Sequence, residues 1–141
     1  MPGIDECLLQ AMVVPGARGA TIVDWTSGLA LGAIGESPGG DVEATAAETA
    51  EMARMATEYQ SFSPQAAQRP GEAPAERGAG AKGLPVEDVI VTTSSGYHVM
   101  RFVETTFDSS VFLHLWLDRD TGNLALARLR MADIAERLVL A

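Results

Sequence analysis

The sequence predicts an α+β fold in which a five-stranded antiparallel sheet carries helices on both faces. Three strand-like runs, at residues 86–93, 97–105 and 111–118, follow one another through short connections. Strands joined in this way pair antiparallel, because a parallel crossover needs about a dozen residues or more. The strands are apolar on both faces, so each face needs a cover of helices or of a second chain. With the elements described next, the order is α-β-β-α-β-β-β-α.

The N-terminal half supplies two helices and a hairpin. Residues 4–14 predict a helix, because their apolar side chains recur at helical spacing and a Pro-Gly pair follows them. Residues 17–25 and 29–35 predict the two strands of a hairpin, whose turn contains Gly28. Residues 41–59 predict the longest helix, with Asp41 as its N-cap.

Residues 61–85 are different in kind. Fourteen of these 25 residues are Pro, Gly or Ala, and no hydrophobic period runs through them. Such a segment buries too little apolar surface to offset the entropy of ordering it. We therefore expect one domain over residues 1–141, with a flexible insert at 61–85.

The last predicted helix follows a turn at residues 119–122 and ends at Arg137.

Composition narrows the classes of partner. The chain has 19 acidic against 10 basic residues, a formal charge of −9. This balance argues against nucleic acid and against an anionic membrane surface, since both are bound through clustered Lys and Arg. A single cysteine, no basic N-terminal region and no apolar run of about 18 residues predict a cytoplasmic protein without membrane insertion.

No residue pattern points to catalysis. The two histidines, His98 and His114, fall on different predicted strands, and Cys7 stands near the N-terminus. A Cys7–His98 nucleophilic pair would lack a third, orienting group. The glycines match no phosphate-binding loop, and Ser94-Ser95-Gly96 is typical of a turn. We therefore expect no catalytic, cofactor or metal site, and a protein that is not an enzyme.

Three segments carry a resemblance to a known family. They are the hairpin GATIVDWTSGLALGAIG, the junction VEDVIVTTSSGYHVMRFVE and the final segment VFLHLWLDRDTGNLALARLRMADIAERL. Together they resemble a Roadblock/LC7 domain, a type with a roadblock/profilin-like fold that includes bacterial partners of Ras-like GTPases. The most specific part is residues 118–138, where a strand ends in an acidic turn and a helix follows.

The resemblance implies a homodimer that acts by binding. In the family the third strands of two protomers pair, and the long second helices lie side by side. The residues expected at this dimer interface are Ala46, Thr49, Ala50, Ala53, Val89, Ile90, Val91 and Thr92. The residues expected to bind the partner are Thr45, Glu48, Met52, Met55 and Tyr59.

The function implied is that of a non-catalytic regulator or scaffold for a Ras-like small GTPase, with a GTPase-activating or a localising role. A histidine-kinase-like protein is a further expected partner, and attachment to the membrane would be peripheral, through partners. A ligand-sensing module of the GAF, PAS or profilin-like kind has a similar plan. It would need a pocket with convergent polar groups, of which the sequence offers few.

Overall fold

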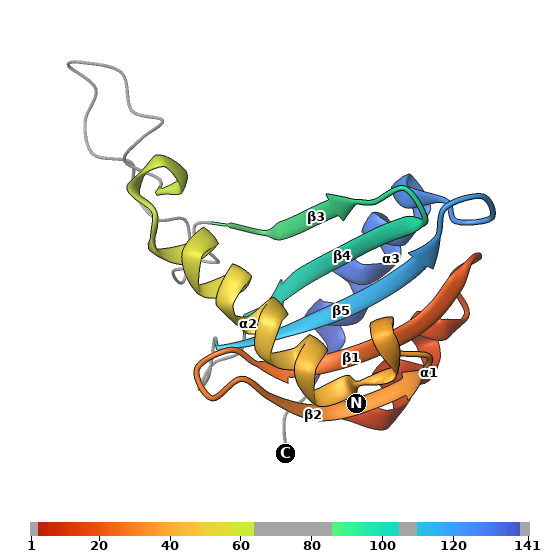
Figure 1. Cartoon of the computed structure of the whole chain (residues 1–141), viewed down its shortest axis with the longest axis horizontal. Coiled ribbons are helices and arrows are strands. Elements are labelled where there is room, and N and C mark those ends of the chain that lie inside the picture. The colour runs from red at the N-terminus through yellow and green to blue at the C-terminus, as the bar shows by residue number, and fades with distance from the viewer. Residues whose placement is uncertain (1–2, 64–85, 105–109, 139–141) are drawn as a thin grey trace.

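The computed structural model describes residues 3–63, 86–104 and 110–138. The predicted order α-β-β-α-β-β-β-α is confirmed (Figure 1), with two short 3-10 turns, η1 (Pro38–Gly40) and η2 (Gln60–Phe62), in addition. The helices are α1 (Ile4–Met12), α2 (Val42–Glu58) and α3 (Leu124–Arg137). The strands are β1 (Ala17–Asp24), β2 (Leu29–Gly35), β3 (Asp88–Thr92), β4 (Gly96–Val103) and β5 (Val111–Asp118).

The strands form one antiparallel sheet in the order β2-β1-β5-β4-β3. The first and last strands of the chain therefore meet at the centre, where Ile22 lies opposite Leu113. This pairing joins the N-terminal hairpin to the C-terminal meander in one sheet. It also leaves β2 and β3 as the two edges of the sheet.

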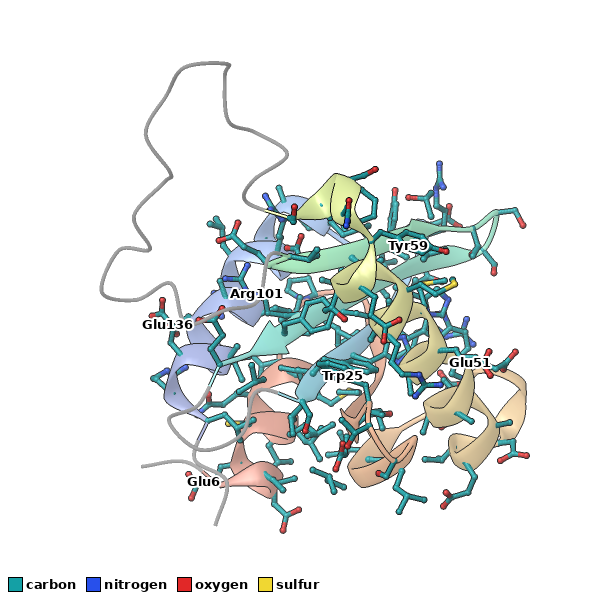
Figure 2. The ribbon with its side chains drawn as sticks, turned by 90° about the vertical axis from the view of Figure 1, so that its left-hand side faces the viewer. Glu6, Trp25, Glu51, Tyr59, Arg101 and Glu136 are labelled. Carbon is teal, nitrogen blue, oxygen red and sulfur yellow. The ribbon has the colours of Figure 1, made fainter. Side chains whose placement is uncertain are left out.

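Helices cover both faces of the sheet, as the apolar strands predict (Figure 1). In Figure 2, α2 lies on one side of the strands and α1 and α3 lie on the other. The larger core cluster packs under α1 and α3 and includes the fully buried Ile22, Val99 and Leu115. The smaller cluster packs under α2, around Phe102 and Phe112.

Local capping explains where two of the helices begin. The side chain of Asp41 accepts a hydrogen bond from the Ala44 N–H at 3.1 Å, which confirms this residue as the N-cap of α2. Asn123 does the same for α3 by accepting from the Leu126 N–H at 3.0 Å. Each cap satisfies a backbone donor that the first turn of a helix leaves without an intrahelical partner.

A 3-10 turn follows α2 at the start of the segment predicted as an insert. Residues Gln60–Phe62 form η2, which the extended residue Tyr59 separates from α2, and the Phe62 ring lies 6.3 Å from the Tyr59 ring. Residues 64–85 lie outside the described residues, so the prediction of a flexible insert stays a prediction.

None of the helices in the described ranges has both the length and the apolar character needed to span a membrane.

Candidate functional site

Three alanines that share one face of α2 form a stripe of small residues, and this stripe packs inside the protomer. Ala46, Ala50 and Ala53 are at most 1% exposed and pack on Val23, Phe102 and the other residues of the smaller cluster. Because alanine has a short side chain, α2 lies close to the strands beneath it. These three members of the predicted dimer interface therefore have no exposed surface left in the protomer for a second chain. Thr49, the fourth member on this helix, is half-buried.

A hydrogen bond from Arg54 shows which flank of α2 lies against the end of β1. Its Nη1 donates to the backbone oxygen of Trp25 at 2.6 Å, which places this flank of the helix against the end of β1. At helical spacing the opposite flank carries Thr45, Met52 and Tyr59. Thr45 and Met52 on that flank are half-buried, and Glu48 lies exposed on the outer side of the helix.

The C-terminal end of α2 carries an exposed apolar patch. Met55, Tyr59 and Phe62 are 48%, 53% and 51% exposed, and we call these three residues the α2 tip. The Tyr59 hydroxyl lies 3.5 Å from the Met55 sulfur, so the α2 tip is one continuous surface. In Figure 1 this end of α2 and η2 reach beyond the strands, and Figure 2 shows Tyr59 on it.

A row of rings lies on the same side of the sheet, beside the part that α2 covers. His98 lies opposite Trp116 in the β4–β5 pairing, with the two rings parallel within 7° and 6.0 Å apart. The Arg18 guanidinium sits 3.8 Å from the centre of the Trp116 ring. We call Arg18, His98, His114 and Trp116 the His–Trp row. His98 and Trp116 are half-buried, unlike the fully covered Phe112 beneath α2.

The two histidines, which lie on the neighbouring strands β4 and β5, contact each other. The Nδ1 atom of His98 lies 2.9 Å from the Nε2 atom of His114, within hydrogen-bond distance. Burial, with a smaller contribution from the field of His98, lowers the pKa of His114 to about 3. Burial also lowers the pKa of His98. Both rings are therefore neutral at pH 7, and the row carries its positive charge on Arg18.

The alternation of backbone hydrogen bonds decides which groups of β3 face outward. The Thr93 N–H donates to the Gly96 oxygen at 2.8 Å. The Phe102 N–H donates to the Glu87 oxygen at 3.1 Å. Bonded positions alternate along an antiparallel pair, so the odd-numbered residues of β3, Val89 and Val91, bond to β4. The outward backbone groups belong to Asp88, Ile90 and Thr92.

The remaining candidates for chemistry are structural. Cys7 is buried in the core under α1 and α3, where burial raises the pKa of its thiol, and the sheet separates it from His98. Thr93 Oγ1 accepts from the Gly96 N–H at 3.0 Å, which makes the serine-containing segment a turn, as predicted. Within the ranges 3–63, 86–104 and 110–138, no three His, Cys, Asp or Glu side chains converge to hold a metal ion.

Comparisons with known proteins place this architecture among solved structures. No family model and no curated protein matches the chain. A Roadblock/LC7 domain from Streptomyces avermitilis superposes with a TM-score of 0.65 at 16% identity, over 96% of this chain and 93% of that one. The gliding protein MglB of Thermus thermophilus gives a TM-score of 0.65 at 17% identity, over 94% and 82%. MglB of Myxococcus xanthus gives 0.59 at 19% identity, over 92% and 77%.

These likenesses agree with the element order of the fold. They also agree with the three segments that resemble this domain type in the sequence. At such identities a structural likeness speaks for the fold alone. The chain has the Roadblock/LC7 fold.

Proposed function

We propose that the protein is a homodimeric, non-catalytic regulator or scaffold of a Ras-like small GTPase. The Roadblock/LC7 fold and the resemblance of the three sequence segments support this proposal. The single observation that carries it is the α2 tip, because large apolar side chains left on a helix end mark a contact site. A histidine-kinase-like protein and peripheral attachment to a membrane belong to the same proposal.

In the proposed dimer the β3 strands of two protomers pair. The outward N–H and C=O groups of Asp88, Ile90 and Thr92 supply the hydrogen bonds, and β3 contains no proline that would prevent them. Pairing at this edge would double the sheet. The half-buried Thr49 and the outer side of α2 are then the parts of the helix that remain for contact with the second protomer.

The partner would be bound on the side of the sheet that carries α2. There the α2 tip provides apolar contact, the His–Trp row provides flat rings and one cation, and Glu48, Glu51 and Glu58 provide exposed negative charge along α2. In Figure 2 the side chain of Glu51 points away from the sheet. A complementary partner surface has apolar side chains at its centre and basic side chains at its rim.

Substitution of Met55 by glutamate tests this proposal. Because Met55 is 48% exposed, the change should leave folding intact while it places a charge at the centre of the contact. We expect capture of the Ras-like GTPase from the same genome, loaded with a non-hydrolysable GTP analogue, to weaken by about tenfold or more, as for a central interface residue. The measurement is biolayer interferometry with purified proteins.

Val13→Glu is the matched control. Val13 is 71% exposed and follows α1 on the other side of the sheet, so this variant should bind the GTPase like the unaltered protein. Equal capture by Met55→Glu and Val13→Glu would contradict the proposed contact site. Turnover of GTP by the isolated protein would contradict a non-catalytic role.

A further inference from the structure

A groove lies between α3 and the edge strand β3, on the side of the sheet away from α2. Its volume is about 820 Å³, within the range of small-molecule sites. Five of its lining residues are apolar, one on β3 and four on α3. These residues are Ile90, Leu124, Ala125, Leu129 and Ala132. In the single protomer Ile90 is 36% and Leu129 is 71% exposed, so the groove is open to solvent there.

The groove is also lined by charged residues. These are Glu87, Arg101 and Arg128, and Asp88 lies between the two arginines. Arg128 is committed to Asp88 through two hydrogen bonds, from Nε at 2.7 Å and from Nη2 at 3.4 Å. The groove therefore has apolar side chains next to charged ones, which suits an amphipathic ligand.

Arg101 is the charged residue of the groove whose hydrogen-bond donors are not used. Its side chain is only 18% exposed, and its terminal nitrogens lie 3.7 Å from Asp88 and 3.9 Å from Glu87, too far for hydrogen bonds. Its Nε–H is buried without a partner among the described residues. A guanidinium removed from water without hydrogen bonds is costly, and a carboxylate is the group that satisfies it best. Figure 2 shows Arg101 on the α3 side of the sheet.

We infer that this groove binds a small amphipathic carboxylate, such as a medium-chain fatty acid. The carboxylate accepts hydrogen bonds from Nε and Nη2 of Arg101 and displaces Glu87 from Nη2, since the Glu87 side chain is 74% exposed and free to move away. The acyl chain lies over Ile90, Leu124 and Leu129. From Glu87 to Ile90 the strand rises about 10 Å, so a chain of medium length reaches these apolar side chains.

Two features favour a compact ligand with one charge. Only one guanidinium of the groove lacks hydrogen bonds, because Arg101 has long ion pairs to Asp88 and Glu87 whereas Arg128 is hydrogen-bonded to Asp88. The chain as a whole carries a charge of −9, which disfavours a partner with many negative charges. The site is separate from the surface proposed for the GTPase, since the sheet lies between them (Figure 2).

Titration of the purified protein with decanoate, followed by calorimetry and by methyl resonances of Ile90 and Leu129, tests the inference. Arg101→Gln should weaken binding by about tenfold or more, the loss of a charge-assisted pair. Glu87→Gln should tighten binding, because it removes the competing carboxylate. Arg130→Gln, an exposed arginine of α3 outside the groove, should bind decanoate like the unaltered protein.

Decanol and a helical peptide with one glutamate among leucines complete the set of probes. No saturable binding of decanoate, or binding that Arg101→Gln leaves unchanged, would overturn the inference. So would equal affinity for decanol. Binding of the peptide alone would replace the small ligand by a polypeptide partner. If Arg101→Gln does not fold, Leu129→Asp serves instead, since that side chain is 71% exposed. GTPase capture should respond to Met55→Glu and not to these variants, so the two proposals fail independently.

Discussion

Replacement of His114 by leucine should remove most of the acid sensitivity of the fold between pH 7 and pH 5. His114 is 2% exposed, and burial lowers its pKa to about 3 in the folded chain, against about 6.5 in an unfolded one. Below pH 6.5 the unfolded chain therefore binds a proton that the folded chain does not. The free energy of unfolding falls as the pH falls from 6.5 towards 3, where folded His114 also becomes protonated.

The expected size of this effect follows from the two pKa values. Between pH 7 and pH 5, the difference in proton binding at His114 lowers the free energy of unfolding by about 2 kcal/mol. His98 adds to the loss in the same direction, because burial lowers its pKa as well, and it is less buried than His114. Hydrogen bonds from turn residues lower the pKa of Asp24 and of Asp118, so these carboxylates take up their protons below this pH window.

Urea unfolding at pH 7 and pH 5, at one protein concentration, measures the difference. His114→Leu should lose less than about half of what the unaltered protein loses. The half-buried His98 can exchange its lost partner for water. His98→Gln keeps the buried imidazole of His114 and should retain a clear loss of stability in acid. An equal loss in His114→Leu and in the unaltered protein would refute the assignment of the acid sensitivity to His114.

Two further substitutions test the edge and the turns of the sheet. Sedimentation equilibrium should give twice the monomer mass of 14.8 kDa for the unaltered protein and for Ile90→Val, and the monomer mass for Ile90→Pro, which removes an outward N–H. A dimeric Ile90→Pro would exclude pairing through β3. Gly16→Ala should destabilise the fold by at least about 1 kcal/mol more than Gly39→Ala. Both glycines have positive φ, of 84° and 67°, but only at Gly16 would a Cβ meet backbone, 2.5 Å from the Gly122 Cα. Equal melting temperatures for the two variants would show that close approach at Gly16 has no cost.

The sequence by itself determined the helices and strands, and it determined that the strands pair antiparallel. Alternating and helical periods are local properties, and so is the N-cap at Asp41, which depends on one side chain and a backbone N–H three residues away. Short connections forced the last three strands to be antiparallel. For these reasons the order of elements, the fold class and the presence of helices on both faces were predictable from the residues.

Tertiary structure alone decided what each face touches. Helical spacing placed the alanines of α2 on one stripe but could not say whether that stripe meets a second helix or the sheet. The phenylalanines of β4 and β5 lie beneath it, so the stripe packs inside the protomer. The contact of His98 with His114 likewise depends on the register of β4 against β5, which opposes His98 to Trp116. A strand register results from the packing of the whole domain and is not encoded at either position.

The groove at Arg101 shows the same division. In the sequence, Arg101 lies in a predicted strand and the apolar residues of the last helix follow some 25 positions later. Nothing in the sequence indicates that the arginine and these apolar residues are in contact. Helix α3 packs on β4 and leaves part of the edge strand β3 exposed. Only this packing brings Arg101, Ile90 and Leu129 together. Local patterns determine elements because neighbouring residues create them. Sites of this kind arise from residues distant in sequence, so only the folded chain decides them.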